Sequence, residues 1–249
     1  MSGWEAIAIG AAGFGAGTIN TVVGSGTLLT FPVLLAFGYA PVTANVSNTV
    51  GLVAGGLTGT HGYRAELAGQ KRRASRLAAF SVAGAVTGAI LLLALPSAAF
   101  KAIVPAFIGI ALLLVVAQPL LGARLEARRA RGLRGGRWLP AALFAVGVYG
   151  GYFGAAQGIL LLSVLGLAIT ESMQRVNGLK NLLATATNLV AALVFIVATH
   201  IDWGVAALLA IGSTLGGLLG ARVGRRLPPA ALRGLIVAIG LIAIAKLTV

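Results

Sequence analysis

The sequence predicts an all-α, polytopic membrane protein built as an inverted repeat, in which each half has one glycine-broken re-entrant helical hairpin and three transmembrane helices. Three observations lead to this fold class. The composition is 58% hydrophobic and only 10% charged, which could not form a water-soluble surface for 249 residues. Apolar runs of spanning length, ~20 residues, recur along the chain. Two further apolar segments are interrupted by glycines and match each other.

The predicted elements follow one another within a single membrane domain. The first half, residues 1–122, opens with the broken segment 4–37, and the second half, residues 138–249, opens with the broken segment 138–169. Three spans follow each broken segment, and they are expected near residues 44–62, 77–95, 101–121, 178–199, 203–221 and 230–247. A basic linker, residues 123–137, joins the two halves.

The two broken segments correspond to each other residue type for residue type. The matching pairs are Gly15 with Gly147, Gly26 with Gly158 and Asn45 with Asn177, each 132 positions apart. This pattern indicates a duplicated membrane unit, each copy of which interrupts an apolar segment of spanning length. In membrane proteins this combination points to a transported ligand.

The net charge of +14 comes from cations that cluster in short loops between the spans. The three clusters are Arg64, Lys71, Arg72, Arg73 and Arg76; Arg124, Arg128, Arg129, Arg131, Arg134 and Arg137; and Arg222, Arg225 and Arg226. Aromatic residues do not interleave with the first or third cluster, and Trp138 only closes the second, so we expect no nucleic-acid partner. Basic loops between spans are typical of the cytoplasmic side, where we place them.

The basic clusters also predict how the broken segments enter the bilayer. If segment 138–169 crossed the membrane once, the cluster at Arg222 would lie outside, against the charge rule. If the segment dips in and returns, that cluster is cytoplasmic. We therefore expect a re-entrant hairpin there and, by the repeat, a second one at 4–37 that enters from the opposite side. Arms of about 12 residues reach ~18 Å at 1.5 Å per residue, so the two tips should meet near the bilayer centre.

The two tips are the predicted substrate site. Non-helical backbone inside a bilayer is tolerated only where protein or a water-filled cavity satisfies it, and a helix that restarts there favours an anion at its N-terminus. The candidate binding residues in the tips are Thr18, Asn20, Thr21, Gly24, Ser25, Gly26, Thr27, Tyr152, Gln157 and Gly158. The alternative is that the glycines only allow close packing, as we expect for the ladder Gly212, Gly216, Gly220 and Gly224.

A second polar cluster follows each hairpin and completes the candidate substrate site. Its members are Asn45, Asn48, Asn177, Lys180 and Asn181. Lys180, which the repeat places opposite Asn48, is a functional candidate because a cation within a span is costly unless it pairs. The alternative is an interfacial lysine whose amine reaches the headgroups. Thr185, Thr187 and Asn188, farther along the same span, are expected to line the path.

Several function classes are disfavoured by what the chain lacks. It has no cysteine, and its two histidines and five acidic residues fall in loops or at predicted span ends. No HExxH, P-loop or Ser/His/Asp arrangement occurs at one membrane level, so we expect no enzyme, no metal and no cofactor. A cation carrier would be expected to have carboxylates within its spans. A non-transporting membrane scaffold and a homodimer both stay open.

The first half also contains three runs that resemble the TauE/SafE sulfite exporter family of membrane permeases. They are GTINTVVGSGTLLTFP at 17–32, GYAP at 38–41 and ANVSNT at 44–49. The resemblance extends over essentially the whole chain, although the second tip has Gln157 where the family often has a denser glycine run. It implies secondary transport, with export as the expected direction, of a small anion such as sulfite or an organosulfonate across a prokaryotic inner (cell) membrane. We expect alternating access, in which the two inverted halves rock about a midplane anion site. Import, or transport of another small organic or inorganic anion, is the alternative.

Overall fold

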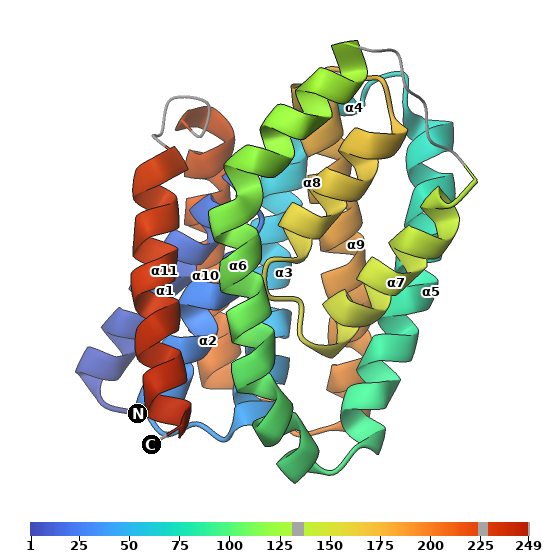
Figure 1. Ribbon diagram of the computed structural model, residues 1–249. Helices are drawn as coiled ribbons and strands as arrows, with labels where there is room; N and C mark the ends of the chain where they lie inside the picture. The colour runs from blue at the N-terminus through green and yellow to red at the C-terminus, as the bar shows by residue number, and fades with distance from the viewer. Residues whose placement is uncertain (131–136, 224–228, 249) are drawn as a thin grey trace.

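The computed structural model of the protein describes residues 1–130, 137–223 and 229–248, which form eleven helices and no strand (Figure 1). The helices are α1 (Gly3–Val22), α2 (Thr27–Ala36), α3 (Pro41–Gly62), α4 (Arg64–Leu67), α5 (Lys71–Ala94), α6 (Ser97–Ala130), α7 (Leu139–Tyr152), α8 (Gln157–Ala168), α9 (Met173–Ala198), α10 (Trp203–Val223) and α11 (Pro229–Thr248). The all-α fold class predicted from the sequence is confirmed.

Four helices are long and apolar enough to cross a membrane: α5, α6, α9 and α10. α3, with 22 residues, and α11, with 20, occupy the other two predicted spans. Large apolar side chains on these helices are exposed, among them Leu113 at 71% and Val197 at 87%. An apolar surface of this extent is stable only against lipid, so the protein is a multi-pass membrane protein.

The basic linker expected at residues 123–137 begins as a continuation of α6, which ends only at Ala130. Some of the predicted basic positions lie outside the described residues. These are Arg131, Arg134, Arg225 and Arg226, with Gly224 of the glycine ladder, and the side chains of Arg124, Arg128 and Arg129.

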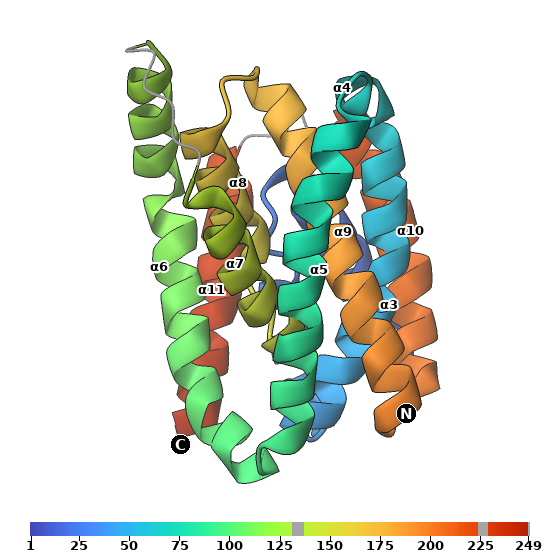
Figure 2. The same ribbon diagram turned by 90° about the vertical axis from the view of Figure 1, so that its right-hand side faces the viewer.

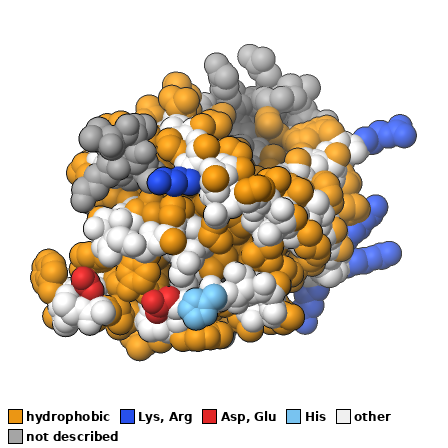
Figure 3. All heavy atoms as spheres, turned by 90° about the horizontal axis from the view of Figure 1, so that it is seen from below, with side chains coloured by type: hydrophobic (Ala, Val, Ile, Leu, Met, Phe, Trp, Pro, Cys, Tyr) orange, Lys and Arg blue, Asp and Glu red, His pale blue; other side chains and the backbone are white. Residues whose placement is uncertain are grey.

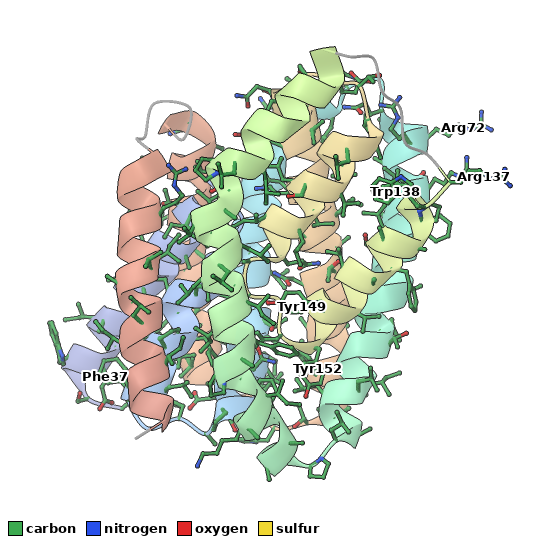
Figure 4. All side chains as sticks on the ribbon, viewed as in Figure 1. Phe37, Arg72, Arg137, Trp138, Tyr149 and Tyr152 are labelled. Atoms are coloured by element: carbon green, nitrogen blue, oxygen red, sulfur yellow. The ribbon has the colours of Figure 1, made fainter. Side chains whose placement is uncertain are left out.

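The two broken segments form hairpins that open toward opposite ends of the bundle (Figure 1). α1 and α2 open toward the end where both chain termini lie, and Phe37 is found there after α2 (Figure 4). α7 and α8 open toward the other end, which carries Trp138, Arg137 and Arg72 (Figure 4). Each hairpin therefore returns to the end from which it entered, although the inverted repeat itself stays a prediction.

The hairpin between α7 and α8 lies between two groups of long helices. α6 and α11 form one side of the bundle, and α3, α5, α9 and α10 form the other (Figure 2). Seen from the end that carries the termini, the surface is largely hydrophobic with few charged side chains (Figure 3). Arg73 and Arg175, at the starts of α5 and α9, belong to the opposite end, whereas Lys101, near the start of α6, lies at the end that carries the termini.

The first arm of each hairpin packs on a span of the opposite half of the sequence. α1 lies along α10 and α7 lies along α5. A Cβ atom on Gly17 would meet the backbone of Ser213, and one on Gly147 would meet the backbone of Ser81. Gly216 of the ladder likewise faces the backbone of α1. These glycines allow helix axes to approach closely, so in the arms the packing alternative holds.

These contacts shift the predicted correspondence between the two hairpins. Ser81 and Ser213 are 132 positions apart, but Gly17 and Gly147, which they face, are 130 apart. Gly15 instead faces the side chain of Leu29 in its own hairpin. The two offsets differ because α8 has 12 residues and α2 has only 10. The starts of these two helices are therefore 130 positions apart, and their ends are 132 positions apart.

Candidate substrate site at the two helix breaks

Both hairpins break with the same backbone geometry. The N–H of Gly24 donates to the carbonyl of Ile19 (2.9 Å), and the N–H of Gly154 donates to the carbonyl of Tyr149 (3.0 Å). Gly24 has φ +91° and Gly154 has φ +74°, in the left-handed region that glycine adopts without strain. Among the described residues that are not glycine, Ala156 alone has a positive φ, of 58°. The backbone is therefore turned sharply at each break.

The two breaks touch each other. The N–H of Gly158 donates to the carbonyl of Gly24 at 3.0 Å. A Cβ atom on either glycine would collide with the backbone of the other. The tips therefore meet inside the bundle, as the sequence predicts, and both positions require glycine.

The end of α1 is covered by three donors from α9. The ammonium group of Lys180 donates to the carbonyls of Asn20 (2.9 Å) and Thr21 (3.2 Å). The side-chain amides of Asn177 and Asn181 donate to the carbonyl of Thr21 at 3.4 and 3.3 Å. Lys180 is 1% exposed, which excludes an amine among the headgroups. Its charge faces the negative end of the α1 dipole, where a cation is favourable.

The second hairpin has a matching but weaker arrangement. The side-chain amide of Asn45, the repeat partner of Asn177, donates to the carbonyl of the last residue of α7 at 3.0 Å. The repeat partner of Lys180 is Asn48, whose carbonyl oxygen accepts a hydrogen bond from Thr30 at 2.5 Å. Each break is therefore capped by the first span of the other half, but only the first break has a charged cap.

The N-termini of α2 and α8 are already partly satisfied within the protein. The N–H of Gly26 donates to the side-chain oxygen of Asn20 (2.6 Å), and the N–H of Gly158 donates to Gly24. These two N–H groups therefore already have protein acceptors, whereas binding of an anion at the restarting helices stays a prediction. A ligand at the breaks has to rely on side-chain donors for most of its hydrogen bonds.

A small cavity lies at the meeting point of the breaks. Its volume is about 30 Å³, enough for one or two water molecules. The predicted site residues that line it are Asn20, Thr21, Gly24, Thr27, Gln157, Gly158, Lys180 and Asn181, with Thr185 and Asn188 of the expected path. Sequence reasoning missed Leu52, Gly56, Gly154 and Ala184. The repeat could have indicated Gly56, because the offset of 132 pairs it with Asn188 of the expected path.

The remaining predicted site residues do not line this cavity. They are Thr18, Ser25, Gly26, Asn45, Asn48, Tyr152 and Asn177. Thr18 donates to the carbonyl of Gly216 at 3.0 Å and so holds α1 on α10. The ring of Tyr152 packs against Phe100 and Phe107, with centroids 5.7 and 5.8 Å apart. Of this group, Asn45 and Asn177 support the breaks, because their side-chain amides donate to the backbone carbonyls of Tyr152 and Thr21.

Gln157 presents an unused donor to the cavity. It is 3% exposed, and its side-chain nitrogen has no hydrogen-bond partner in the structure. Its amide packs closely on Gly150, so the side chain has little freedom to turn elsewhere. A buried donor without a partner costs ~1–3 kcal/mol. A ligand acceptor or a water molecule in the cavity would remove this cost.

Lys180 is a buried positive charge with no carboxylate beside it. Among the described side chains, the acidic residues occupy helix starts or loops: Glu5, Glu66, Glu171 and Asp202. Ion pairs between described residues involve Glu5 and Glu171, not Lys180. No group of three His, Asp or Glu residues in the described part of the chain could hold a metal ion. The cavity is thus lined by one basic side chain and by no described acidic one.

A helical membrane protein with two broken helices that meet at a buried polar cavity has the architecture of a membrane transporter. Comparison with known proteins agrees. The model of the family described as sulfite exporter TauE/SafE matches residues 9–247. The chain therefore belongs to the TauE/SafE family and is a membrane transporter.

Two curated relatives carry similar descriptions. The "Probable membrane transporter protein YfcA" of Escherichia coli K12 is 27% identical over 236 residues, which cover 93% of this chain and 85% of the relative. A "Probable membrane transporter protein" of Haemophilus influenzae is 26% identical over 211 residues, covering 85% and 82%. No solved structure matches the chain.

Proposed function

We propose that the protein is a secondary transporter that exports a small anion, sulfite or an organosulfonate, across a prokaryotic inner membrane. The observation that carries the proposal is Lys180, a buried ammonium group without a described carboxylate partner, on the cavity where the two breaks meet. A buried unpaired charge costs several kcal/mol, and an anionic ligand would offset that cost. The same charge would repel a cation.

The donors around the cavity fit an oxyanion. Lys180 supplies the charge, and Gln157 supplies a side-chain N–H without a protein partner. Hydrogen bonds to charged groups contribute ~1.5–3 kcal/mol each. A sulfonate or sulfite group has three oxygen acceptors, so it could use both donors together. The family description, sulfite exporter, supports the choice of a sulfur oxyanion.

The charge distribution supports an orientation for the protein. The end that bears Arg72 and Arg137 is proposed to face the cytoplasm, because basic loops between spans stay on that side. Both termini are then outside. A monovalent anion that leaves a negative-inside cell gains ~2.3 kcal/mol per 100 mV, so export needs no further energy source.

We place the alternating motion between two bodies that mix the halves of the sequence. One body contains α1, α3 and α10, and the other contains α5, α7 and α9; α9 also packs extensively on α3, and the motion would have to slide along that contact. The hydroxyl of Ser213 ties α10 to α3 by accepting from the N–H of Gly55 (3.1 Å) and donating to the carbonyl of Gly51 (3.0 Å). Rocking the two sequence halves apart would separate α1 from α10 and break backbone contacts of the glycines.

The cavity lies between these two bodies. Asn20 and Gly56 come from the first body, and Lys180 and Thr185 come from the second. In the present conformation the cavity holds only about 30 Å³, which is the closed state of such a cycle. The packing of the first arms supports the inverted repeat. α1 of the first half packs on α10 of the second half, and α7 of the second half packs on α5 of the first half.

The test is transport by purified protein in liposomes. Sulfite, thiosulfate, sulfate, sulfoacetate, taurine and non-sulfur anions are compared as substrates, with direct binding measured in parallel. Lys180→Gln is expected to reduce anion flux by at least tenfold, because it removes the only described charge at the cavity. The matched control is Lys101→Gln, at an exposed position near the opposite end of the bundle. Equal flux in the two variants would remove Lys180 from the site.

Other outcomes would point to the alternatives. A preference for nickel or for neutral solutes would overturn the anion proposal, and uptake against the predicted orientation would show an importer. Absence of flux with every solute, from protein that is folded, would favour a non-transporting scaffold.

A further inference from the structure

A second, larger cavity lies at the basic end of the molecule, away from the helix breaks. Its volume is about 580 Å³, within the range of ligand-binding pockets. It is bounded by the start of α5, the start of α7 and the connection from α8 to α9. The charged side chains that line it are Arg72, Arg73, Arg76, Arg175 and Glu171, which leave an excess of three positive charges.

Part of this charge is held in fixed positions by Glu171. Its carboxylate pairs with Arg73 at 2.8 Å and with Arg175 at 2.9 Å. The hydrogen bond from Arg73 holds the pKa of the Glu171 carboxyl below its usual range, so the carboxylate stays ionised. Arg72 and Arg76 have no ion pair among the described residues. These two guanidinium groups, four residues apart on α5, lie on the same helix face and are available to an anion.

The cavity has a charged part and an apolar part at different levels of the membrane. Leu77 and Phe80 follow Arg73 and Arg76 on the same face of α5, one turn farther into the membrane. Leu139 and Pro140 face them from the start of α7. Here the charge is at the membrane surface and the apolar wall is below it.

The surface beside the cavity continues this pattern. Trp138, next to the α7 side of the lining, is 41% exposed, and Trp at this level is typical of the membrane interface. Farther along α5 and α7, Ile90 and Phe144 are 53% and 40% exposed. An acyl chain that leaves the cavity would therefore lie on apolar protein surface.

We propose that this cavity binds the phosphate headgroup of an anionic phospholipid, with Arg72 and Arg76 on the phosphate and the acyl chains against Leu77, Phe80 and the α5–α7 surface. Basic pockets between membrane helices on the cytoplasmic side are suited to such headgroups. The bound lipid bridges α5 and the foot of the second hairpin. The site does not depend on what the protein transports.

The experiment measures lipid binding to the purified full-length protein in detergent. Phosphatidylglycerol and phosphatidylcholine with identical acyl chains are compared by native mass spectrometry and by the shift in Tm. Phosphatidylglycerol is expected to be retained and to raise the Tm, and Arg72→Gln/Arg76→Gln is expected to weaken its binding roughly tenfold or more. The matched control is Arg64→Gln/Lys71→Gln, which removes the same charge from the same end, outside the lining.

Two results would overturn the proposal. If both double variants lost the same amount of phosphatidylglycerol binding, the lipid would be attracted by the general surface charge of this end and not bound in this cavity. Binding of glycerol phosphate or inorganic phosphate as tight as that of phosphatidylglycerol would mean that the cavity holds a soluble anion. The four substituted side chains are exposed, so both variants are expected to fold, and unchanged Tm in lipid-free detergent verifies this.

Discussion

The two helix breaks share a backbone geometry but differ in what caps them. The first break is covered by Asn177, Asn181 and the charged Lys180 of α9, whereas the second is covered by the single amide of Asn45 from α3. A duplicated unit would produce equal caps. Only the first break therefore has a basic side chain on it, and a ligand of the proposed kind would meet that side chain from one side of the cavity.

The largest expected effect tests the contact that both breaks share. Gly24→Ala places a Cβ atom at positive φ and into the backbone of Gly158. Left-handed strain and overpacking together should lower the free energy of unfolding by about 3 kcal/mol. The control is Gly38→Ala, which has φ +85° but open space around it and should lose about 1 kcal/mol. Thermal and SDS unfolding measure both, and equal losses would mean that the breaks do not touch.

The next effect concerns the charge that distinguishes the two caps. In Lys180→Asn/Asn48→Lys the charge moves to the repeat partner, which faces Thr30 and not the cavity. Anion affinity should fall by ~10–100-fold, as for one lost charged hydrogen bond, and the swap should not restore it. Isothermal titration with sulfite measures this. Full affinity in the swapped variant would show that the two positions are equivalent.

The next prediction compares two side-chain amides at the second break. We expect Gln157 to donate to the ligand, whereas Asn45 donates to the backbone. Gln157→Leu removes an amide nitrogen with no protein partner, so it should lower anion affinity by about tenfold. It should also raise the Tm, because the cost of ~1–3 kcal/mol for a buried donor without a partner is removed. Asn45→Leu removes the cap of the second break and should lower stability by ~1 kcal/mol with little change in affinity. If Asn45→Leu lowered the affinity and Gln157→Leu lowered the stability, Asn45 would be the ligand donor and Gln157 the cap.

The smallest effect lies at the foot of the second hairpin. Glu171 ties the α8–α9 connection to Arg73, and the corresponding position in the first half is Tyr39. Because the pKa of the Glu171 carboxyl is lowered in the folded protein, its stabilisation is present above its usual pKa of about 4.5 and is lost as the pH falls through the lowered folded value. The pair is partly exposed, so about 0.5 kcal/mol is expected.

The measurement is the Tm of wild-type protein and Glu171→Gln between pH 3 and 7. The wild type should be slightly more stable at pH 7, and the difference should vanish at the acidic end. A difference that persists below the lowered pKa would show that Glu171 acts through packing and not through charge.

Hydropathy and glycine placement were enough to predict that two apolar segments are broken, because this depends on local composition. The expected arms of about 12 residues were wrong for the first arms: α1 has 20 residues and stays helical to Val22, and α7 has 14. The register of the hairpins was not predictable, since two extra residues inside an apolar helix such as α8 leave no mark in the sequence. The helix on which each first arm packs could not be predicted either. Gly17 is needed because the backbone of Ser213, in the other half of the sequence, lies against it. Close packing of this kind appears only when distant segments are assembled.

The candidate site shows the same division. Lys180 could be singled out from the sequence because a lysine within an apolar span is unusual, but its hydrogen bonds to the carbonyls of α1 depend on where α1 ends. Tyr152 was expected to bind a ligand because it lies in the second tip, yet its ring belongs to an aromatic cluster. Position in a tip is local information, whereas the direction of a side chain depends on the fold.

The isolated charge of Lys180 has a consequence for the electrical behaviour of the proposed cycle. A carrier loaded with a monovalent anion is neutral at this position, whereas the empty carrier bears one positive charge. The resting potential of the cell, negative inside, acts on the empty form alone and draws Lys180 toward the cytoplasm, by up to ~2.3 kcal/mol per 100 mV. Voltage would thus return the empty carrier to the side where the anion is collected. Transient currents on supported membranes should report this step, and they should disappear in Lys180→Gln.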